Sequence, residues 1–282
     1  MRYIITAKEV AKGTSTQDIA NPLAVTEIAT ELIITRLACI MLLKDNKITK
    51  SDTVVTNEDR KCLYENIFQN TISWKEFQQT DLLPNDDVID LLSSSIHSRL
   101  HLRNGKNQKI PYLPFYQHWE RDKKEITDIN FSDLSNYDLN GDFVALLIRT
   151  RGAWPEKNLP EDYWRELIKE LEKQNKKVLV FGKETEIYAS DSVQYISTFR
   201  DWCGIVKHPN CKSIVSTITG GVYPAFICGN PELKLIIVDN LDLVKEYGYD
   251  PSWYNDCINF SKIQKIILNY KPTPQALMEI II

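Results

Sequence analysis

Basic side chains, hydroxyl groups and glycines follow the apolar segments in the second half of the chain, and together such groups can bind a diphosphate. Arginine pairs with phosphate oxygens through two parallel hydrogen bonds, and backbone amides at a helix start add further donors. An acid such as Glu184 can bind a ribose hydroxyl pair. Taken singly, each arginine could equally form a surface ion pair, and Glu184 could equally be a solvated loop residue. The candidates are Arg149, Arg151, Lys157, Gly182, Lys183, Glu184, Thr198, Phe199, Arg200, Thr219, Gly220 and Gly221.

Two adjacent glycines, Gly220 and Gly221, interrupt the segment VSTITGGVYPAFICGN (215–230) between a β-branched run and a second apolar stretch. One interpretation is a tight turn, because glycine tolerates positive φ and close packing. The other is that a charged ligand group lies on bare backbone amides where a helix begins. The segment alone leaves both interpretations open.

A parallel sheet would bring these candidates together, because ligands bind outside the carboxyl ends of its strands. Apolar segments between 141 and 282 predict the strands, and amphipathic segments predict helices that cover them. The tail from Pro272 is expected to pack back on the body, since its terminal isoleucines are apolar. The predicted strands are 142–151, 176–182, 193–198, 211–219 and 233–240, and the predicted helices are 159–175, 200–208 and 222–229.

The first half alternates in the same way and predicts a second parallel α/β domain over 1–140. After a loop-rich stretch at 104–125, the chain is polar up to the boundary that we place near residue 140. The fold class is therefore α/β, with two Rossmann-like parallel-sheet domains. The predicted strands are 2–7, 52–57 and 71–77, and the predicted helices are 23–44, 58–68 and 86–103.

The bulk composition is that of a globular protein with two domains of ordinary size. The chain has 282 residues, of which 43% are hydrophobic and 26% charged. A net charge of −4 gives no global attraction to nucleic acid or acidic lipid. The longest apolar run, 32–43, contains Arg36 and is too short to span a membrane, and the N-terminus lacks a signal-peptide pattern. We expect a cytoplasmic protein.

Motifs for several common cofactor and metal classes are missing from the sequence. Neither half carries GxGxxG or GxxxxGK[ST], which argues against a dinucleotide-dependent dehydrogenase and a P-loop kinase. The six cysteines form no CxxC pair, and a zinc set of Cys203, His208 and Cys211 lacks a second ligand pair with matching spacing. The adjacent acids of NDDVID (85–90) are interpreted as the start of a helix, so we predict no metal site.

Two long segments resemble a known family. The segment 146–182, LLIRTRGAWPEKNLPEDYWRELIKELEKQNKKVLVFG, resembles the nucleotide-binding half of GT-B glycosyltransferases, in particular the heptosyltransferase-like and fucosyltransferase-like branches. The segment 218–239, ITGGVYPAFICGNPELKLIIVD, is similar to their donor-phosphate loop, helix and following strand. The first half fits the same pattern but lacks the Gly-Asp pair that heptosyltransferases carry directly after strand one.

The resemblance implies a glycosyltransferase whose two domains face each other across a cleft, with a nucleotide-sugar in the C-terminal domain and a glycan or sugar acceptor in the N-terminal one. The diphosphate charge would be stabilised by the candidates above, without a metal and with no cofactor besides the nucleotide-sugar co-substrate. Inverting transfer needs a general base from the first domain, for which we choose Asp18, then Glu9, then Asp59. Asp59 also fits the acidic first turn of a helix.

Other residues and other functions stay open. His97 and His101, one helical turn apart, fit a base, a metal pair or a solvated helix face. An aromatic wall against a sugar ring and a hydrophobic plug are both compatible with Tyr112, Phe115, Tyr116 and Trp119. The alternatives to a glycosyltransferase are a non-catalytic nucleotide-sugar-binding protein and a nucleotide-sugar epimerase. An epimerase is expected to carry acids and histidines near the phosphate loop, where this chain has only His208.

Overall fold

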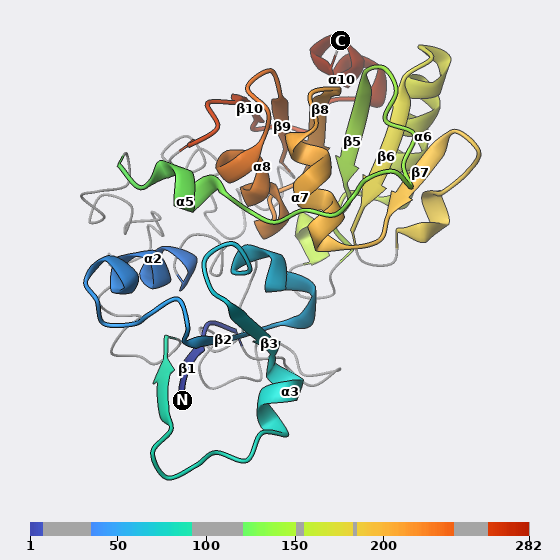
Figure 1. The fold of residues 1–282 in the computed structure, drawn as a ribbon. Helices are drawn as coiled ribbons and strands as arrows, with labels where there is room; N and C mark the ends of the chain where they lie inside the picture. Colours follow the sequence, from blue (N-terminus) through green and yellow to red (C-terminus); the bar gives the residue numbers. More distant parts are fainter. Residues whose placement is uncertain (8–34, 92–120, 151–154, 183–184, 240–258, 282) are drawn as a thin grey trace. The chain divides into compact units, whose positions relative to one another are not determined.

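A computed structural model of the chain contains two compact α/β units, Met1–Phe131 and Ser132–Ile282 (Figure 1). The structure describes residues 1–7, 35–91, 121–150, 155–182, 185–239 and 259–281. Each unit is built on its own parallel sheet, which agrees with the predicted fold class.

Unit 1, Met1–Phe131, holds a sheet of four parallel strands in the order β3-β2-β1-β4. The strands are β1 (Arg2–Ile5), β2 (Thr53–Thr56), β3 (Asn70–Ser73) and β4 (Asp87–Asp90). The β-branched strand β2 is buried along its whole length. Tyr3, Ile5 and Val55 form a buried cluster with Phe77 packed against it. β4 is a largely exposed edge strand.

The described residues of this unit also form short helices, namely α2 (Arg36–Lys44), η2 (Glu58–Leu63), α3 (Trp74–Gln78) and α5 (Lys123–Thr127). α2 ends in a Schellman motif, in which Lys47 N–H donates to the Leu42 carbonyl at 2.9 Å and Asn46 N–H to the Leu43 carbonyl at 3.1 Å. Asn46 has φ 54°, a left-handed conformation that asparagine tolerates better than most residues. The motif turns the chain sharply toward β2.

A fully buried arginine joins these helices. Arg36 of α2 is 0% exposed, and its guanidinium donates to the backbone carbonyls of Leu63, Glu125, Ile126 (3.1 Å) and Asp128 (2.7 Å). These carbonyls lie at the end of η2 and around α5. A single side chain therefore fixes α5 against α2 and η2.

Three predictions for the first half are corrected. The segment 86–103 was expected to be helical from its first residues, yet Asp87–Asp90 is a strand paired in parallel with β1, so the acids of NDDVID do not begin a helix. The predicted strand 71–77 ends at Ser73, because Ser73 and Glu76 form a capping box that starts α3. The predicted helix 58–68 is a 3₁₀ helix over Glu58–Leu63.

Unit 2, Ser132–Ile282, holds a sheet of six parallel strands in the order β10-β9-β8-β5-β6-β7. Five of them coincide with the predicted strands, and β10 was not predicted. The strands are β5 (Phe143–Leu147), β6 (Lys177–Phe181), β7 (Val193–Ile196), β8 (Cys211–Ser216), β9 (Lys234–Val238) and β10 (Gln264–Leu268). β5 is buried along its whole length, as expected for a strand covered on both faces.

The helices of this unit lie on both faces of its sheet (Figure 1). α6 and α10 share one core with alternate residues of the strands, and α7 and α8 pack together over the other face. Leu277 and Met278 of α10 are buried in that first core, which confirms that the tail packs back. The helices are η4 (Pro155–Lys157), α6 (Glu161–Lys173), η5 (Glu186–Tyr188), α7 (Phe199–Lys207), η6 (Gly220–Val222), α8 (Tyr223–Cys228) and α10 (Pro274–Ile281).

Candidate functional site

The strand order of unit 2 reverses between β5 and β8. From β5 the chain proceeds to β6 and then β7 on one side, and it returns to the other side of β5 with β8. Open α/β sheets bind ligands at such a reversal point, outside the carboxyl ends of the two strands. Ser216 Oγ, at the end of β8, donates to the Leu147 carbonyl at the end of β5 (3.1 Å), which fixes the two strand ends together.

Arg149 lies two residues beyond the end of β5 and is only 7% exposed. Its Nη1 donates to Asn158 Oδ1, and Asn158 directly follows η4, where its own N–H donates to the Pro155 carbonyl at 2.8 Å. A guanidinium held at the reversal point of a parallel sheet is suited to bind an anion. Of the two predicted arginines that the structure describes, Arg149 and Arg200, the strand order brings Arg149 to this reversal point.

The glycine pair lies at the same reversal point, on the β8 side. Thr219 is the N-cap residue of η6, whose first two residues are Gly220 and Gly221. A Cβ atom at Gly221 would lie 2.9 Å from Leu147 Cδ2, closer than normal packing allows. Among the described glycines, positive φ occurs at Gly141 and Gly182 and not at Gly221, so at this turn glycine is explained by close packing and not by positive φ. Gly221 allows close packing against β5.

A tryptophan fixes this glycine turn from the other side. Trp202 of α7 is fully buried, and its Nε1 donates to the Gly221 carbonyl at 2.9 Å. Its ring is stacked on Phe181 at the end of β6, with centroids 5.1 Å apart and an interplanar angle of 15°. The Gly221 carbonyl, α7 and the end of β6 are therefore held in place before any ligand binds.

Two further polar residues at strand ends, Thr217 and Asp239, are not among the predicted site residues. Thr217, 2% exposed, follows β8, and its Oγ1 has no hydrogen-bond partner within the part of the chain that the structure describes. Asp239, 1% exposed, directly follows β9. Both terminate apolar strand segments, and that position was the signal that could have identified them. A buried polar group at a strand end is a candidate ligand contact.

Of the other described candidates, Gly182 follows β6, and Thr198, Phe199 and Arg200 follow β7, one and two strands away from β5 on the side opposite β8. Lys157 is the last residue of η4. Gly182 has φ 154°, and a Cβ there would be 2.1 Å from the Ile148 carbonyl, so glycine is required by the close backbone approach. Thr198 caps α7, with its Oγ1 accepting from Asp201 N–H at 3.0 Å. Phe199 is buried, whereas Arg200 and Lys157 are half-buried.

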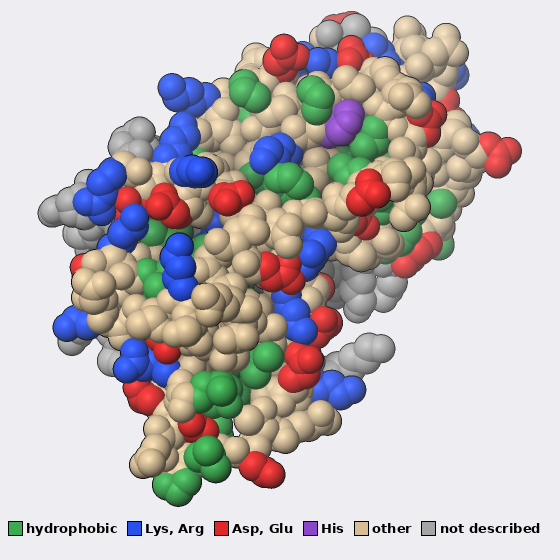
Figure 2. Space-filling model, viewed as in Figure 1, with side chains coloured by type: hydrophobic (Ala, Val, Ile, Leu, Met, Phe, Trp, Pro, Cys, Tyr) green, Lys and Arg blue, Asp and Glu red, His purple; other side chains and the backbone are tan. Residues whose placement is uncertain are grey.

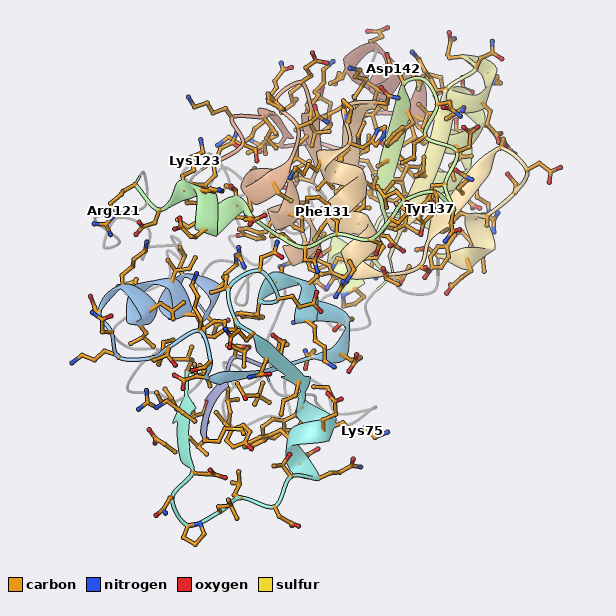
Figure 3. All side chains as sticks on the ribbon, viewed as in Figure 1. Lys75, Arg121, Lys123, Phe131, Tyr137 and Asp142 are labelled. Carbon is orange, nitrogen blue, oxygen red and sulfur yellow. The ribbon has the colours of Figure 1, made fainter. Side chains whose placement is uncertain are left out.

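Beside these strand ends, Tyr137 joins the segment before β5 to α7 (Figure 3). Its hydroxyl donates to Asp201 Oδ2 at 2.9 Å. Burial, and to a lesser degree Asp201, raises the pKa of Tyr137 above its ordinary value. The hydroxyl therefore stays protonated at neutral pH and acts as a structural donor.

Several candidates lie outside the described residues. The catalytic candidate Asp59 is described: it lies in the first turn of η2, where its carboxylate is exposed and 3.8 Å from Arg60 Nε. The role of Asp59 as a general base stays a prediction.

The candidates outside the described ranges are Glu9, Asp18, His97, His101, Tyr112, Phe115, Tyr116, Trp119, Arg151, Lys183 and Glu184.

The cysteines that the structure describes are free and buried, namely Cys39, Cys62, Cys203, Cys211 and Cys228. Burial raises the pKa of Cys39 and Cys211 far above the ordinary range of a thiol, which makes them unreactive. Burial also lowers the pKa of His208. Within the described ranges, no three His, Cys, Asp or Glu side chains are placed to hold a metal ion, and no helix has the length and apolar character needed to cross a membrane.

Comparisons with known proteins identify the fold. No family model matches the sequence, and no curated protein matches it. The ADP-heptose LPS heptosyltransferase II of E. coli superposes with a TM-score of 0.51 at 10% identity, over 99% of this chain and 96% of that one. A glycosyl transferase family 9 protein of Veillonella parvula DSM 2008 gives a TM-score of 0.51 at 11% identity, over 98% and 87%. The chain shares the GT-B type fold of these proteins, as the sequence resemblance predicted.

Proposed function

We propose that this chain, which has the fold of GT-B glycosyltransferases, transfers a sugar from a nucleoside-diphosphate sugar to an acceptor hydroxyl. The observation that carries the proposal is the reversal point between β5 and β8, where buried Arg149, buried Thr217 and the Gly220-Gly221 turn follow adjacent strand ends. A cation, a hydroxyl and backbone amides are the groups that stabilise charge on a leaving diphosphate.

The reaction that we propose is a single displacement with inversion. The acceptor oxygen forms a bond to the anomeric carbon of the donor while the bond from that carbon to the diphosphate oxygen breaks. The electron pair of the broken bond stays on the diphosphate, next to Arg149 and the amides of the glycine turn. The proton of the acceptor hydroxyl passes to a carboxylate of unit 1, for which Asp18, Glu9 and Asp59 remain the candidates. This step requires no metal.

We propose a nucleotide-sugar as the donor and a glycan or sugar as the acceptor. The E. coli protein of the same fold is named for ADP-heptose, which makes ADP-linked sugars the first donors to test. We further propose a cytoplasmic location, which five buried free thiols support, because thiols stay reduced in that compartment. The nucleotide-binding role falls to unit 2 and the acceptor role to unit 1.

A panel of ADP-, GDP-, UDP- and CMP-sugars tests the proposal. We expect one nucleotide class to raise the melting temperature and to release free sugar slowly in the absence of acceptor. Chelator should leave that release unchanged. Binding without release, also with candidate acceptors present, would identify a non-catalytic binding protein, and release of an epimerised nucleotide-sugar would identify an epimerase. If no member of the panel binds, the proposal is wrong.

A further inference from the structure

Unit 1 contains a pocket of about 500 Å³ that the proposed transfer reaction does not use. It lies between the last turn of α2, the following loop, the turn before β3 and α5. The volume is within the range of sites for small molecules. The lining residues are Ile40, Leu43, Lys44, Asn46, Ile48, Thr49, Lys50, Asn66, Ile67, Lys124, Glu125 and Asp128.

The position of the pocket separates it from the expected transfer site. The loop of Asn46 to Lys50 precedes β2, and Asn66 and Ile67 precede β3. Gln69 N–H donates to the Lys50 carbonyl at 2.9 Å, which holds these two segments side by side. The pocket is therefore at the amino ends of the strands, whereas α/β sheets bind substrates at the carboxyl ends.

The pocket has an apolar floor that the fold holds in place. Ile40, Ile48 and Ile67 are 2%, 2% and 7% exposed. The Schellman motif at the end of α2 directs Ile48 inward and leaves Asn46 at the exposed rim. Arg36 fixes α5, which forms the opposite wall. The floor and both walls are thus built before a ligand arrives.

Of the three lysines that line the pocket, one lies close to carboxylates and two do not. Lys44 Nζ lies 3.4 Å from Glu125 Oε1 and 3.4 Å from Asp122 Oδ1. Within the part of the chain that the structure describes, the Nζ atoms of Lys50 and Lys124 take part in no ion pair or side-chain hydrogen bond. Lysine and arginine side chains gather over the side where α2 and α5 lie (Figure 2). Two cations are therefore available to an anionic ligand.

The same rim offers groups that bind hydroxyls. Asp128 Oδ1 accepts from Asn66 Nδ2 at 3.2 Å, so both side chains are held at the pocket and keep further hydrogen-bonding capacity. Asn46 and Thr49 add an amide and a hydroxyl. Carboxylate, amide and hydroxyl groups around an apolar floor match a sugar ring, whose edge is polar and whose face is apolar. The two lysines match a negative group on that sugar.

We propose that this pocket binds a small sugar that carries an anionic group, such as a phosphate or a carboxylate. Lys50 and Lys124 bind the anion, the side chains of Asn46, Asn66 and Asp128 bind ring hydroxyls, and the three isoleucines contact the ring face. The inference concerns a second site and does not depend on the proposed transfer reaction.

Isothermal titration of the full chain with glucose 6-phosphate, glucuronate, glucose and inorganic phosphate tests the proposal. We expect glucose 6-phosphate or glucuronate to bind at least tenfold more tightly than glucose or phosphate. Lys50→Ala and Lys124→Ala should each weaken that binding about tenfold, since each removes a charge-assisted bond. Lys123→Ala is the matched control, because Lys123 is the preceding residue of α5, does not line the pocket and points away from α2 (Figure 3).

The outcomes separate this proposal from the proposed function. Unchanged binding in both lysine variants, equal binding of glucose, or equal binding of phosphate alone would each overturn it. Absence of binding by both anionic sugars would also overturn it. A saturating nucleotide-sugar should not displace the bound sugar, and displacement would mean that the two ligands share one site. Failure of the transfer assay leaves these measurements unaffected.

Discussion

The two units share a strand order around their first strand but use a buried arginine in different ways. In unit 1, Arg36 donates to four backbone carbonyls far along the chain and joins α2, η2 and α5. In unit 2, Arg149 stands just past a central strand, at the point where the strand order reverses, and donates to a side-chain carbonyl. Burial of an arginine therefore does not by itself predict a binding site, whereas a position at the reversal of the strand order does predict one.

The largest effect is expected for Arg36→Met. The variant leaves the buried carbonyls of Leu63 and Ile126 without their donor and removes the part-buried bonds to the Glu125 and Asp128 carbonyls, so unit 1 should lose about 3–5 kcal/mol of unfolding free energy. Urea unfolding followed by hydrogen exchange measures the loss in each unit. Lys75→Ala, at an exposed residue of α3 in the same unit, is the control. An equal loss of protection in unit 2 would contradict the division of roles between the two arginines.

Arg149→Ala should act on ligand binding more than on folding. We expect the Kd for the nucleotide-sugar to rise tenfold or more, because a charge-assisted hydrogen bond contributes about 1.5–3 kcal/mol. Titration of the donor measures the change, and Arg165→Ala is the control, since Arg165 pairs with Glu161 on the exposed face of α6 at 2.7 Å. Unchanged donor affinity in Arg149→Ala would place the ligand away from the reversal point between β5 and β8.

A third test separates packing from binding at the glycine turn. Gly221→Ala brings a Cβ within 2.9 Å of Leu147 Cδ2 and should lower stability by about 1–2 kcal/mol. Leu147→Val in the same chain removes part of that contact and should recover some of the stability. If the turn amides bind phosphate, donor affinity stays low in the double variant. Recovery of affinity together with stability would show that the glycine serves packing alone.

The smallest effect concerns the capping box of unit 1. The Ser73 N–H, then Lys61, lowers the pKa of Glu76 to about 2 from an ordinary value of 4.5. Its contribution to stability is therefore complete above about pH 4.5 and is lost as the pH falls toward 2. Thermal unfolding between pH 5 and 2 should show a shallower decline for Glu76→Gln than for the parent. Parallel curves would mean that the capping carboxylate does not affect the stability of unit 1.

The sequence predicted unit 2 better than unit 1 because the strands of unit 2 are longer and more apolar. The five predicted strands there coincide with β5 to β9, whereas β10 has a mixed burial pattern and was missed. In unit 1, β4 is an exposed acidic strand at the sheet edge, and its pairing with β1 leaves no local hydrophobic pattern. The Ser73–Glu76 capping box was visible in the sequence and would have ended β3 correctly.

The candidate site was predictable in its residues but not in its geometry. Arg149 and the glycine pair follow from the principle that strand ends bind ligands. Sequence periodicity does not reveal which strands are neighbours. The sequence analysis therefore placed candidate ligand contacts at the ends of β6 and β7 as well as at those of β5 and β8. The strand order selects the latter pair. Likewise, the contact of Gly221 with Leu147 joins residues far apart in sequence, which no local pattern encodes.

The strand order also has a consequence for folding kinetics. In unit 1, Arg2 of β1 donates a hydrogen bond to Asp87 of β4 across a separation of 85 residues, whereas in unit 2 Ser216 of β8 donates to Leu147 of β5 across 69. The smaller sheet therefore closes the longer loop, which costs more chain entropy and delays the transition state. Pulse-labelled hydrogen exchange during refolding should detect protection in β5 and β8 before it appears in β1 and β4.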